Sequence, residues 1–225
     1  IASRDPEAAV VVAPSDHLIV DESGFLEVCQ TALDTTRNTT SLVTLGIQPT
    51  RPDTGYGYIQ YEEPQDEATP EVRPVKTFTE KPDLATAETF LSSGEFCWNS
   101  GIFVWSLHNI QAAFEAHLPD MLAEFSDADL NNSLELNAVY GNCDNISIDY
   151  GIMEKSSNVQ VVLCDIGWSD LGTWGSLKEK LASDSDGNAS AHVRIKAIDS
   201  RENLIVGSPS SPDGFQKLVA LKGLE

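Results

Sequence analysis

Two aspartates lie where an acidic side chain can hold a metal ion. Asp16 follows the apolar run 10–12, and Asp170 lies in a glycine-bounded turn after the apolar run 159–164. Such runs favour strands, and the three valines of 10–12 favour a buried parallel strand. Ligands of open α/β sheets bind beyond the carboxyl ends of strands. Mg²⁺ commonly takes one or two carboxylates and completes its shell with water and substrate phosphates. From spacing alone two interpretations stand: a Mg²⁺ site, or Asp170 or Ser169 capping the next helix, the commoner role of loop aspartates.

Three further segments carry side chains suited to a ligand with hydroxyl or phosphate groups. Glu80 could accept hydrogen bonds from hydroxyls and Lys81 could pair with a phosphate, but an exposed strand end whose charges neutralise each other explains this segment alone better. Asn99 offers both a donor and an acceptor just before an expected strand, although its neighbours also favour a plain turn. The turn that contains Gly55 and Gly57 is weak evidence by itself.

Several classes of function are disfavoured by composition and motifs. The formal net charge is −21, from 35 acidic against 14 basic residues, so we expect no binding of nucleic acid through phosphate neutralisation. No apolar run approaches the about 18 residues that a membrane span needs. The sequence has no G-x-S-x-G, Walker A or H-E-x-x-H motif, which argues against a hydrolytic serine or a zinc protease. The four cysteines show no C-x-x-C spacing, so we expect a reducing cytoplasm rather than disulfides or zinc.

Alternating strand and helix signals predict an α/β fold. Strands are expected over 10–12, 41–47, 58–61, 75–80, 101–105, 159–164, 193–198, 204–206 and 218–221. Helices are expected to begin at Asp21 or Ser23, at Pro82 and after Ser106, with further helical signals over 119–140, 149–155 and 175–182. Because the composition changes near residue 184, we expect a main domain over 1–183 and a small β element over 184–225.

Six short motifs occur here in the order that they have in bacterial mannose-1-phosphate guanylyltransferases, also called GDP-mannose pyrophosphorylases. They are PSDH (14–17), RPDTGYGYI (51–59), FTEKP (78–82), WNSGIF (98–103), SIDYGIMEK (147–155) and GWSDLGTW (167–174). Each motif is short, but six in one order with similar gaps are specific. The chain resembles this family over residues 8–225.

The resemblance implies a Rossmann-like nucleotidyltransferase fold, with a mixed and mostly parallel sheet flanked by helices and the start of a C-terminal β-helical element. Members transfer GMP from GTP to mannose 1-phosphate and release pyrophosphate, with Mg²⁺ as the cofactor. Carried over by motif, the implied residues are Asp16 and Asp170 as Mg²⁺ ligands, Lys81 at the sugar phosphate, Gly55, Gly57, Glu80 and Asn99 around the mannose ring, and Asp149 near the sugar site.

One departure from the family affects the expected activity. Its members begin with a strand and a glycine-rich loop that carries an arginine and a lysine, and this sequence has no such segment. We therefore expect the chain to be a fragment that holds the sugar and metal side of the site and is inactive alone. Two alternatives stay open: a sugar-1-phosphate nucleotidyltransferase for another base or hexose, and a non-catalytic sugar-phosphate-binding subunit of the same fold. No nucleic-acid or membrane partner is expected, and a homo-oligomer is left open.

Overall fold

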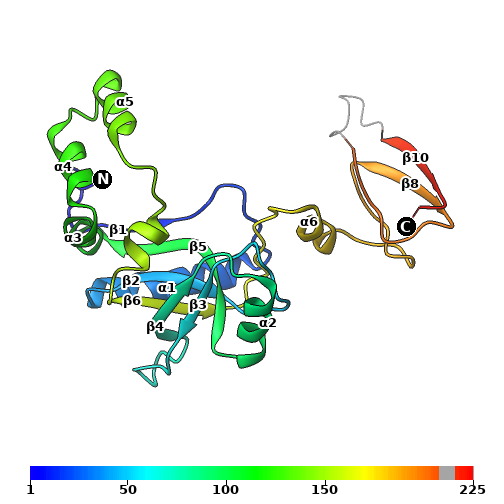
Figure 1. Ribbon diagram of the computed structural model, residues 1–225, viewed down its shortest axis with the longest axis horizontal. Helices are drawn as coiled ribbons and strands as arrows, with labels where there is room; N and C mark the ends of the chain where they lie inside the picture. The colour runs from blue at the N-terminus through cyan, green and yellow to red at the C-terminus, as the bar shows by residue number, and fades with distance from the viewer. Residues whose placement is uncertain (208–215, 225) are drawn as a thin grey trace. The chain divides into compact units, whose positions relative to one another are not determined.

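The computed structural model describes residues 1–207 and 216–224 (Figure 1). The chain divides into two compact units. The first comprises Ile1–Ser15 and Ile19–Trp168, and the second comprises Asp16–Leu18 and Ser169–Glu225. The segment Asp16–Leu18 thus belongs with the later part of the chain, because Leu18 and Ser169 exchange two backbone hydrogen bonds of 2.8 and 2.9 Å.

The first unit is built on a six-stranded sheet in the order β1-β5-β2-β6-β4-β3, with β3 also paired to β5. Its strands are β1 (Ala9–Val12), β2 (Leu42–Ile47), β3 (Tyr58–Tyr61), β4 (Val72–Thr79), β5 (Phe96–Ser106) and β6 (Val159–Cys164). Within this sheet β2 and β6 pair in parallel, whereas the pairs of β1 with β5, β2 with β5, β3 with β4, β3 with β5 and β4 with β6 are antiparallel. The expectation of a mixed sheet is confirmed. The expectation that it is mostly parallel is wrong, because β5 runs between β1 and β2 in the opposite direction.

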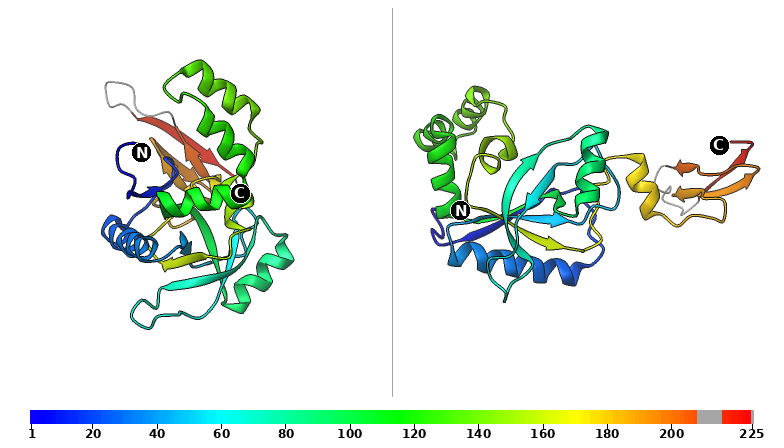
Figure 2. Two further views of the ribbon diagram at one scale, coloured as in Figure 1. Left: turned by 90° about the vertical axis from the view of Figure 1, so that its left-hand side faces the viewer. Right: turned by 60° about the horizontal axis from the view of Figure 1, so that its bottom comes forward.

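Helices of the first unit cover both faces of this sheet (Figure 2). They are α1 (Glu22–Asn38), α2 (Leu84–Ser93), α3 (Leu107–His117), α4 (Pro119–Asp127), α5 (Ser133–Asn142) and the π-helical turn η1 (Asp149–Met153). Of these, α4 and α5 extend away from the sheet beyond α3 (Figure 2). The expected helix starts are confirmed, because side chains of Asp21, Asp83 and Ser106 accept backbone N–H groups at the starts of α1, α2 and α3. Gly94 ends α2 in the left-handed conformation with φ 72°.

Strand β1 differs from the sequence expectation. Its valines suggest a buried parallel strand, but β1 lies at an edge of the sheet and runs antiparallel to β5. Val11 and Val12 are 38% and 46% exposed, because within the described residues the strand pairs on one side alone. β-Branched side chains favour strands, but how deeply a strand is buried depends on its neighbours.

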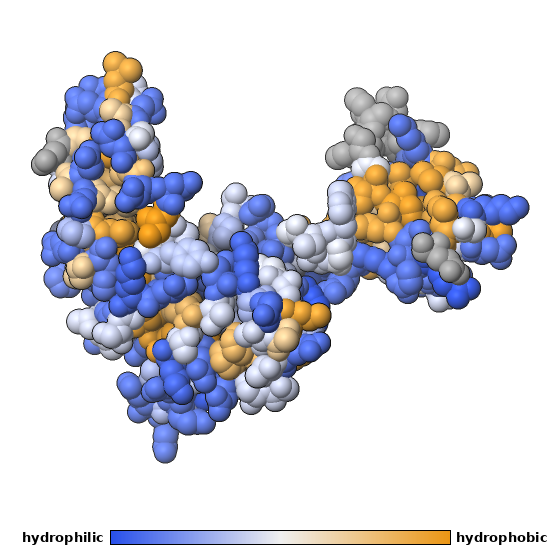
Figure 3. Space-filling view, in the orientation of Figure 1, coloured by the Kyte–Doolittle hydropathy of each residue, from blue (hydrophilic) through white to orange (hydrophobic). Residues whose placement is uncertain are grey.

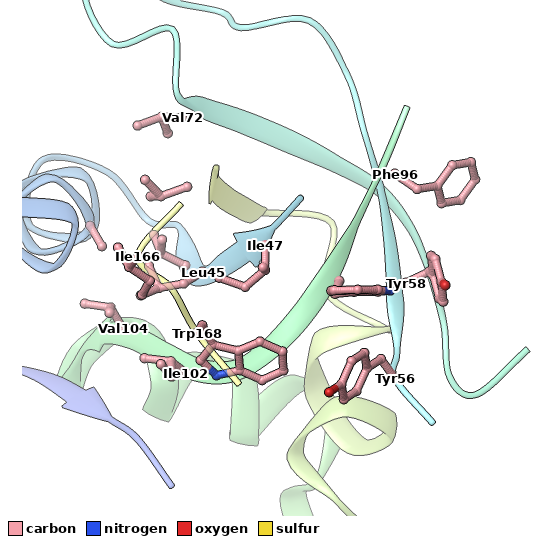
Figure 4. Close-up of a cluster of buried hydrophobic side chains, with 14 of the residues drawn as sticks. Leu45, Ile47, Tyr56, Tyr58, Val72, Phe96, Ile102, Val104, Ile166 and Trp168 are labelled. Carbon is pink, nitrogen blue, oxygen red and sulfur yellow. The ribbon is translucent and has the colours of Figure 1, made fainter. Parts of the chain in front are cut away.

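The core is divided between the two faces by the alternation along each strand. On β2, Val43, Leu45 and Ile47 join the cluster that packs against α1, whereas Leu42 joins the cluster formed with α3 and η1. Burial of each such side chain contributes roughly 1.5–3 kcal/mol relative to exposure. Figure 4 shows the first cluster, where Trp168 lies beside Tyr56 with ring centroids 5.3 Å apart.

In its described residues, the second unit contains one helix and two short parallel strand pairs. Its elements are α6 (Trp174–Lys180), β7 (Ala189–Ala191), β8 (Val193–Ile198), β9 (Leu204–Val206) and β10 (Lys217–Lys222). Strand β7 pairs with β9, and β8 pairs with β10. Apolar residues gather on the surface over β8 and β10 (Figure 3), where Ile198 and Leu218 are 45% and 61% exposed. Among the described residues, no helix has the length and apolar character needed to cross a membrane.

Candidate functional site

Gly57 is the point where two of the predicted site segments meet. It directly precedes β3, whose Tyr58 lies opposite Thr79 at the end of β4, so Glu80 follows beside it. On the other side, the Asn99 backbone N–H of β5 donates to the Gly57 carbonyl at 2.8 Å. A Cβ at position 57 would lie 2.5 Å from Glu80 Oε2 and 3.5 Å from Asn99 Cβ. Glycine at this position therefore leaves the space that the Glu80 carboxylate occupies.

Asn99 lies within β5 rather than in a turn before a strand, which corrects the sequence interpretation. Thr44 lies opposite Phe103 and Gly46 opposite Asn99, so two steps along β2 face four along β5. Gly101 lies inside this irregular stretch with φ 70°, a conformation that glycine adopts without steric cost. Irregularities of this type bend a strand and re-aim its side chains, and they are frequent beside active sites.

The Asn99 side chain connects β5 to the π-helical turn. Its Nδ2 donates to Asp149 Oδ1 at 2.8 Å. Burial raises the pKa of the Asp149 carboxyl above its usual range, and the Asn99 bond opposes this by lowering it. π-Helical turns are rare and often occur at functional sites. Asp149, which the family resemblance placed near the site of Glu80 and Asn99, thus contacts Asn99.

Glu154 also belongs to this group of carboxylates, although the sequence reasoning did not select it. Its backbone N–H donates to the Asp149 carbonyl at 2.8 Å. Partial burial raises the pKa of the Glu154 carboxyl, and repulsion from Asp149 and Glu80 raises it further, while Lys155 opposes the shift. The available signal was the motif over 147–155, which contains both Asp149 and Glu154.

Gly55 lies in the same turn as Gly57 but contacts a different side chain. Its backbone N–H donates to Asp53 Oδ1 at 2.8 Å, and the other Asp53 oxygen accepts from Arg51 Nη2 at 2.8 Å. The Arg51 guanidinium in turn lies over the Trp98 ring, 5.3 Å from its centroid. Gly55 therefore lies in a loop that Asp53 and Arg51 hold in place, and Gly57 is the glycine that contacts Glu80 and Asn99.

Lys81 stands beside this group with a strained backbone. Its Nζ lies 3.6 Å from Glu80 Oε1, and its side chain is 65% exposed. Its φ of 46° is uncommon for a residue other than glycine. Leu171, next to Asp170, is similarly strained with φ 51°. Strained residues cluster at functional sites but also occur in turns, as His192 with φ 61° does here.

The two expected metal ligands belong to the second unit. The backbone pairing of Leu18 with Ser169 brings the segments of Asp16 and Asp170 side by side. Asp170 Oδ1 accepts the Gly172 N–H at 3.0 Å, and a Cβ at Gly172 would lie 2.6 Å from Asp170 Oδ2. A glycine thus leaves space for this carboxylate too.

The helix-capping alternative for Asp170 and Ser169 is wrong. The residue that caps α6 is Thr173, whose side chain accepts the Ser176 N–H at 3.0 Å. Ser169 Oγ instead accepts the Leu171 N–H at 3.3 Å inside the turn. Capping of α6 therefore does not explain why an aspartate lies at position 170.

Comparison with known proteins identifies the family. The chain matches the nucleotidyl transferase family over residues 1–187. It belongs to that family. It is 36% identical over 186 residues to a mannose-1-phosphate guanylyltransferase of Escherichia coli, which covers 80% of this chain and 40% of that protein. It is 37% identical over 224 residues to the xanthan biosynthesis protein XanB of Xanthomonas campestris pv. campestris strain B100, covering 96% of this chain and 44% of that protein.

Solved structures support the same family. A Thermus thermophilus protein described as a mannose-1-phosphate geranyltransferase matches with a TM-score of 0.84 and 30% identity, over 99% of this chain and 62% of that one. A Helicobacter pylori protein described as a mannose-6-phosphate isomerase matches with a TM-score of 0.62 and 30% identity, over 73% of this chain and 65% of that one. This nucleotidyl transferase chain spans about 40–44% of the length of the two curated relatives named above.

The chemistry of Asp16 and Asp170 fits a divalent cation. Mg²⁺ prefers oxygen ligands and usually keeps several waters beside one or two carboxylates. Two aspartates on backbone segments joined by two hydrogen bonds provide such a donor set. In the part of the nucleotidyl transferase that the structure describes, no group of three or more acidic, histidine or cysteine side chains is arranged to hold a metal. A closed protein cage is therefore not formed by these residues, and a water- and substrate-completed ion fits them better.

Proposed function

We propose that this nucleotidyl transferase chain takes part in the transfer of GMP from GTP to mannose 1-phosphate, giving GDP-mannose and pyrophosphate. Relatives that are about 36% identical carry this activity in their names. The observation that carries the proposal in the structure is the meeting of Glu80 and Asn99 at Gly57, with Asp149 hydrogen-bonded to Asn99. Carboxylate and amide groups in such an array accept and donate the hydrogen bonds that a sugar ring requires.

In this proposal the side chains of the first unit bind and orient the sugar phosphate. Glu80 accepts from ring hydroxyls, and Asn99 presents its amide while its Nδ2 is engaged with Asp149. Lys81 is the cation beside this group, and its exposed ammonium pairs with the sugar phosphate. A sugar phosphate is already ionised near neutral pH, so its oxygen can attack the α-phosphorus of GTP without a general base. Catalysis then depends on positioning and charge neutralisation.

Asp16 and Asp170 are the residues that would hold Mg²⁺. The chemistry that Mg²⁺ supplies when bound is neutralisation of the phosphate oxygens that face one another during transfer. The hydrogen bond from the Gly172 N–H orients the Asp170 carboxylate, whose oxygens are of the type that Mg²⁺ prefers. The cost of bringing two carboxylates together is recovered when a cation binds, since opposite charge within about 4–6 Å favours the ionised form.

Metal binding is tested on the 225-residue chain by titrating Mn²⁺, as a spectroscopic substitute for Mg²⁺, and following free Mn²⁺ by electron paramagnetic resonance. We expect Asp16→Asn and Asp170→Asn each to weaken Mn²⁺ binding at least tenfold, with little change in the unfolding temperature. Asp5→Asn is the matched control, because Asp5 is an exposed carboxylate of the first unit that bonds to the nearby Glu7 N–H. Equal binding by the wild type and by both site variants would show that the metal assignment is wrong.

Substrate binding is tested by titrating the same chain with mannose 1-phosphate, with and without Mg²⁺ and GTP, by calorimetry. We expect sugar-phosphate binding that Glu80→Gln weakens. Stronger coupling to ATP, UTP or dTTP than to GTP would favour a nucleotidyl transferase for another base. Sugar-phosphate binding that neither Mg²⁺ nor any nucleotide affects would favour a non-catalytic subunit. Because the sequence has no glycine-rich loop with arginine and lysine, we expect no pyrophosphate release by this chain alone.

A further inference from the structure

The side-chain amide of Asn99 has an oxygen end and a nitrogen end, and its surroundings distinguish them. Oδ1 receives the Gly101 backbone N–H at 3.2 Å and the Thr44 hydroxyl at 3.1 Å. Nδ2 donates to Asp149 Oδ1 at 2.8 Å. A reversed amide would place its NH₂ against the Gly101 N–H and its oxygen against a carboxylate oxygen. Both contacts would be repulsive, so the observed orientation is the one that these neighbours favour.

Thr44 is the side chain that approaches the oxygen end. It lies on β2 with no exposed surface, on the sheet face that also carries Asn99. Asn99 Oδ1 and the Ile102 carbonyl oxygen each lie 3.1 Å from Thr44 Oγ1, so these two acceptors share its one hydroxyl proton. A buried hydroxyl must find such a partner, and valine, which has the same shape without the hydroxyl, would fill a core position of a sheet as well.

The register shift of β5 explains why Thr44 can reach Asn99. Thr44 lies opposite Phe103, four residues beyond Asn99 along β5. The irregular stretch around Gly101 folds the intervening backbone so that Asn99 returns toward Thr44. The residue type, the burial and the strand register of Thr44 therefore all favour its hydrogen bond with Asn99.

We propose that Thr44 is a positioning residue for the sugar site: its buried hydroxyl, together with the Gly101 N–H, fixes the orientation of the Asn99 amide that donates to Asp149. Thr44 itself touches no substrate in this arrangement. The hydrogen bonds among Thr44, Asn99 and Asp149 are present in the chain without a ligand. Only the expected effect of Thr44 on sugar binding rests on the proposed function.

The test compares Thr44→Val, which loses the hydroxyl, with Thr44→Ser, which keeps it. The carboxyl ¹³C resonance of Asp149 is titrated with pH in the ligand-free chain. Because the Asn99 bond lowers the pKa of Asp149, we expect the Asp149 midpoint to move up in Thr44→Val and to return to the wild-type midpoint in Thr44→Ser. The charged group that interacts with Asp149 is Glu154, on which Glu80 and Lys155 also act, and all three are unchanged in both variants.

The matched control is Thr36→Val. Thr36 is also a buried threonine, 1% exposed, and its hydroxyl donates to the Ser41 carbonyl at 2.9 Å away from this group. We expect this variant to lower the unfolding temperature without moving the Asp149 midpoint. An unchanged Asp149 midpoint in Thr44→Val, or an equal shift in Thr36→Val, would overturn the proposal.

Two further measurements keep the proposal open to refutation. In the wild-type chain, the Asn99 amide protons should show stronger NOEs to the Asp149 β-protons than to the Thr44 methyl, and the reverse pattern would overturn the proposal even where Thr44→Val fails to fold. In calorimetry, Thr44→Val should weaken mannose 1-phosphate binding roughly two- to tenfold, the range expected for one neutral hydrogen bond. If the wild-type chain does not bind the sugar phosphate, the proposed function fails, and the Asp149 titration alone decides the role of Thr44.

Discussion

Replacing Gly57 by alanine should weaken sugar-phosphate binding while leaving the fold intact. The added Cβ would lie 2.5 Å from Glu80 Oε2, closer than a Cβ approaches an oxygen atom, so one of them must move. The atom that yields is the end of a flexible side chain that is 23% exposed. The Gly57 backbone does not have a positive φ, so alanine brings no backbone strain. The displacement of the Glu80 carboxylate is therefore the main consequence.

The size of the effect follows from the bond that is lost. A hydrogen bond to a charged group contributes about 1.5–3 kcal/mol, which corresponds to a roughly 10- to 150-fold weaker Kd for mannose 1-phosphate. Alanine also restricts the unfolded chain relative to glycine, an effect of about 0.4–1 kcal/mol that favours the fold. We therefore expect the unfolding temperature of Gly57→Ala to stay within a few degrees of the wild type.

The assay pairs calorimetric titration of mannose 1-phosphate with thermal unfolding, and Gly55→Ala is the matched control. A Cβ at Gly55 would meet Asp53 Oδ1 at 3.1 Å and would not touch Glu80. It alters the same turn, so it shares any general effect of alanine there. The reasoning is refuted if Gly57→Ala binds as tightly as Gly55→Ala, or if its affinity falls only because the variant unfolds.

Three further predictions concern stability and reactivity. Burial raises the pKa of Asp149, so the stability that this carboxyl contributes is present at low pH and is lost as pH rises through the raised pKa. Asp149→Asn should therefore unfold at a higher temperature than the wild type at pH 7. An equally large gain in unfolding temperature at pH 3 would contradict this. Burial raises the pKa of the Cys97 thiol, so iodoacetamide should label the partly exposed Cys143 before Cys97 in the native chain. Equal labelling rates of the two cysteines, followed by mass spectrometry, would contradict this. Gly167→Ala should cost about 2–5 kcal/mol in denaturant unfolding, because φ is 63° and the new Cβ would lie 2.7 Å from the Cβ of Val20, whereas Gly175→Ala, whose nearest contact is 3.6 Å, should cost little.

Local sequence signals predicted the elements of this fold well where each element depends on its own residues. Strands β3, β6, β8 and β9 have the bounds that their apolar runs predict. The polar residues before α1, α2 and α3 cap them because side-chain oxygens satisfy free N–H groups within a few residues. These are short-range effects, and a sequence carries them directly.

Properties that depend on distant segments could not be predicted in this way. Asn99, Ser100 and Gly101 favour a turn locally, yet they lie inside β5 because β2 and β3 pair with it on both sides. The direction of β5 makes the sheet mainly antiparallel, and no periodicity within a strand reports the direction of its neighbours. Gly57 is weak evidence in the sequence because Glu80, the residue that requires it, is brought beside it only by the pairing of β3 with β4.

The carboxylates around Asn99 are better explained by a ligand than by stability. Burial raises the pKa of the partly buried Asp149 carboxyl. Burial also raises the pKa of the Glu154 carboxyl, and the charges of Asp149 and Glu80 raise it further. Like charges held together destabilise a fold, and asparagine or glutamine would relieve the repulsion while keeping much of the hydrogen bonding. Ionised carboxylates only accept hydrogen bonds, and a sugar offers several hydroxyl donors on one ring. A hydroxyl-rich ligand would therefore satisfy these acceptors together, which is the role that the proposed function gives them.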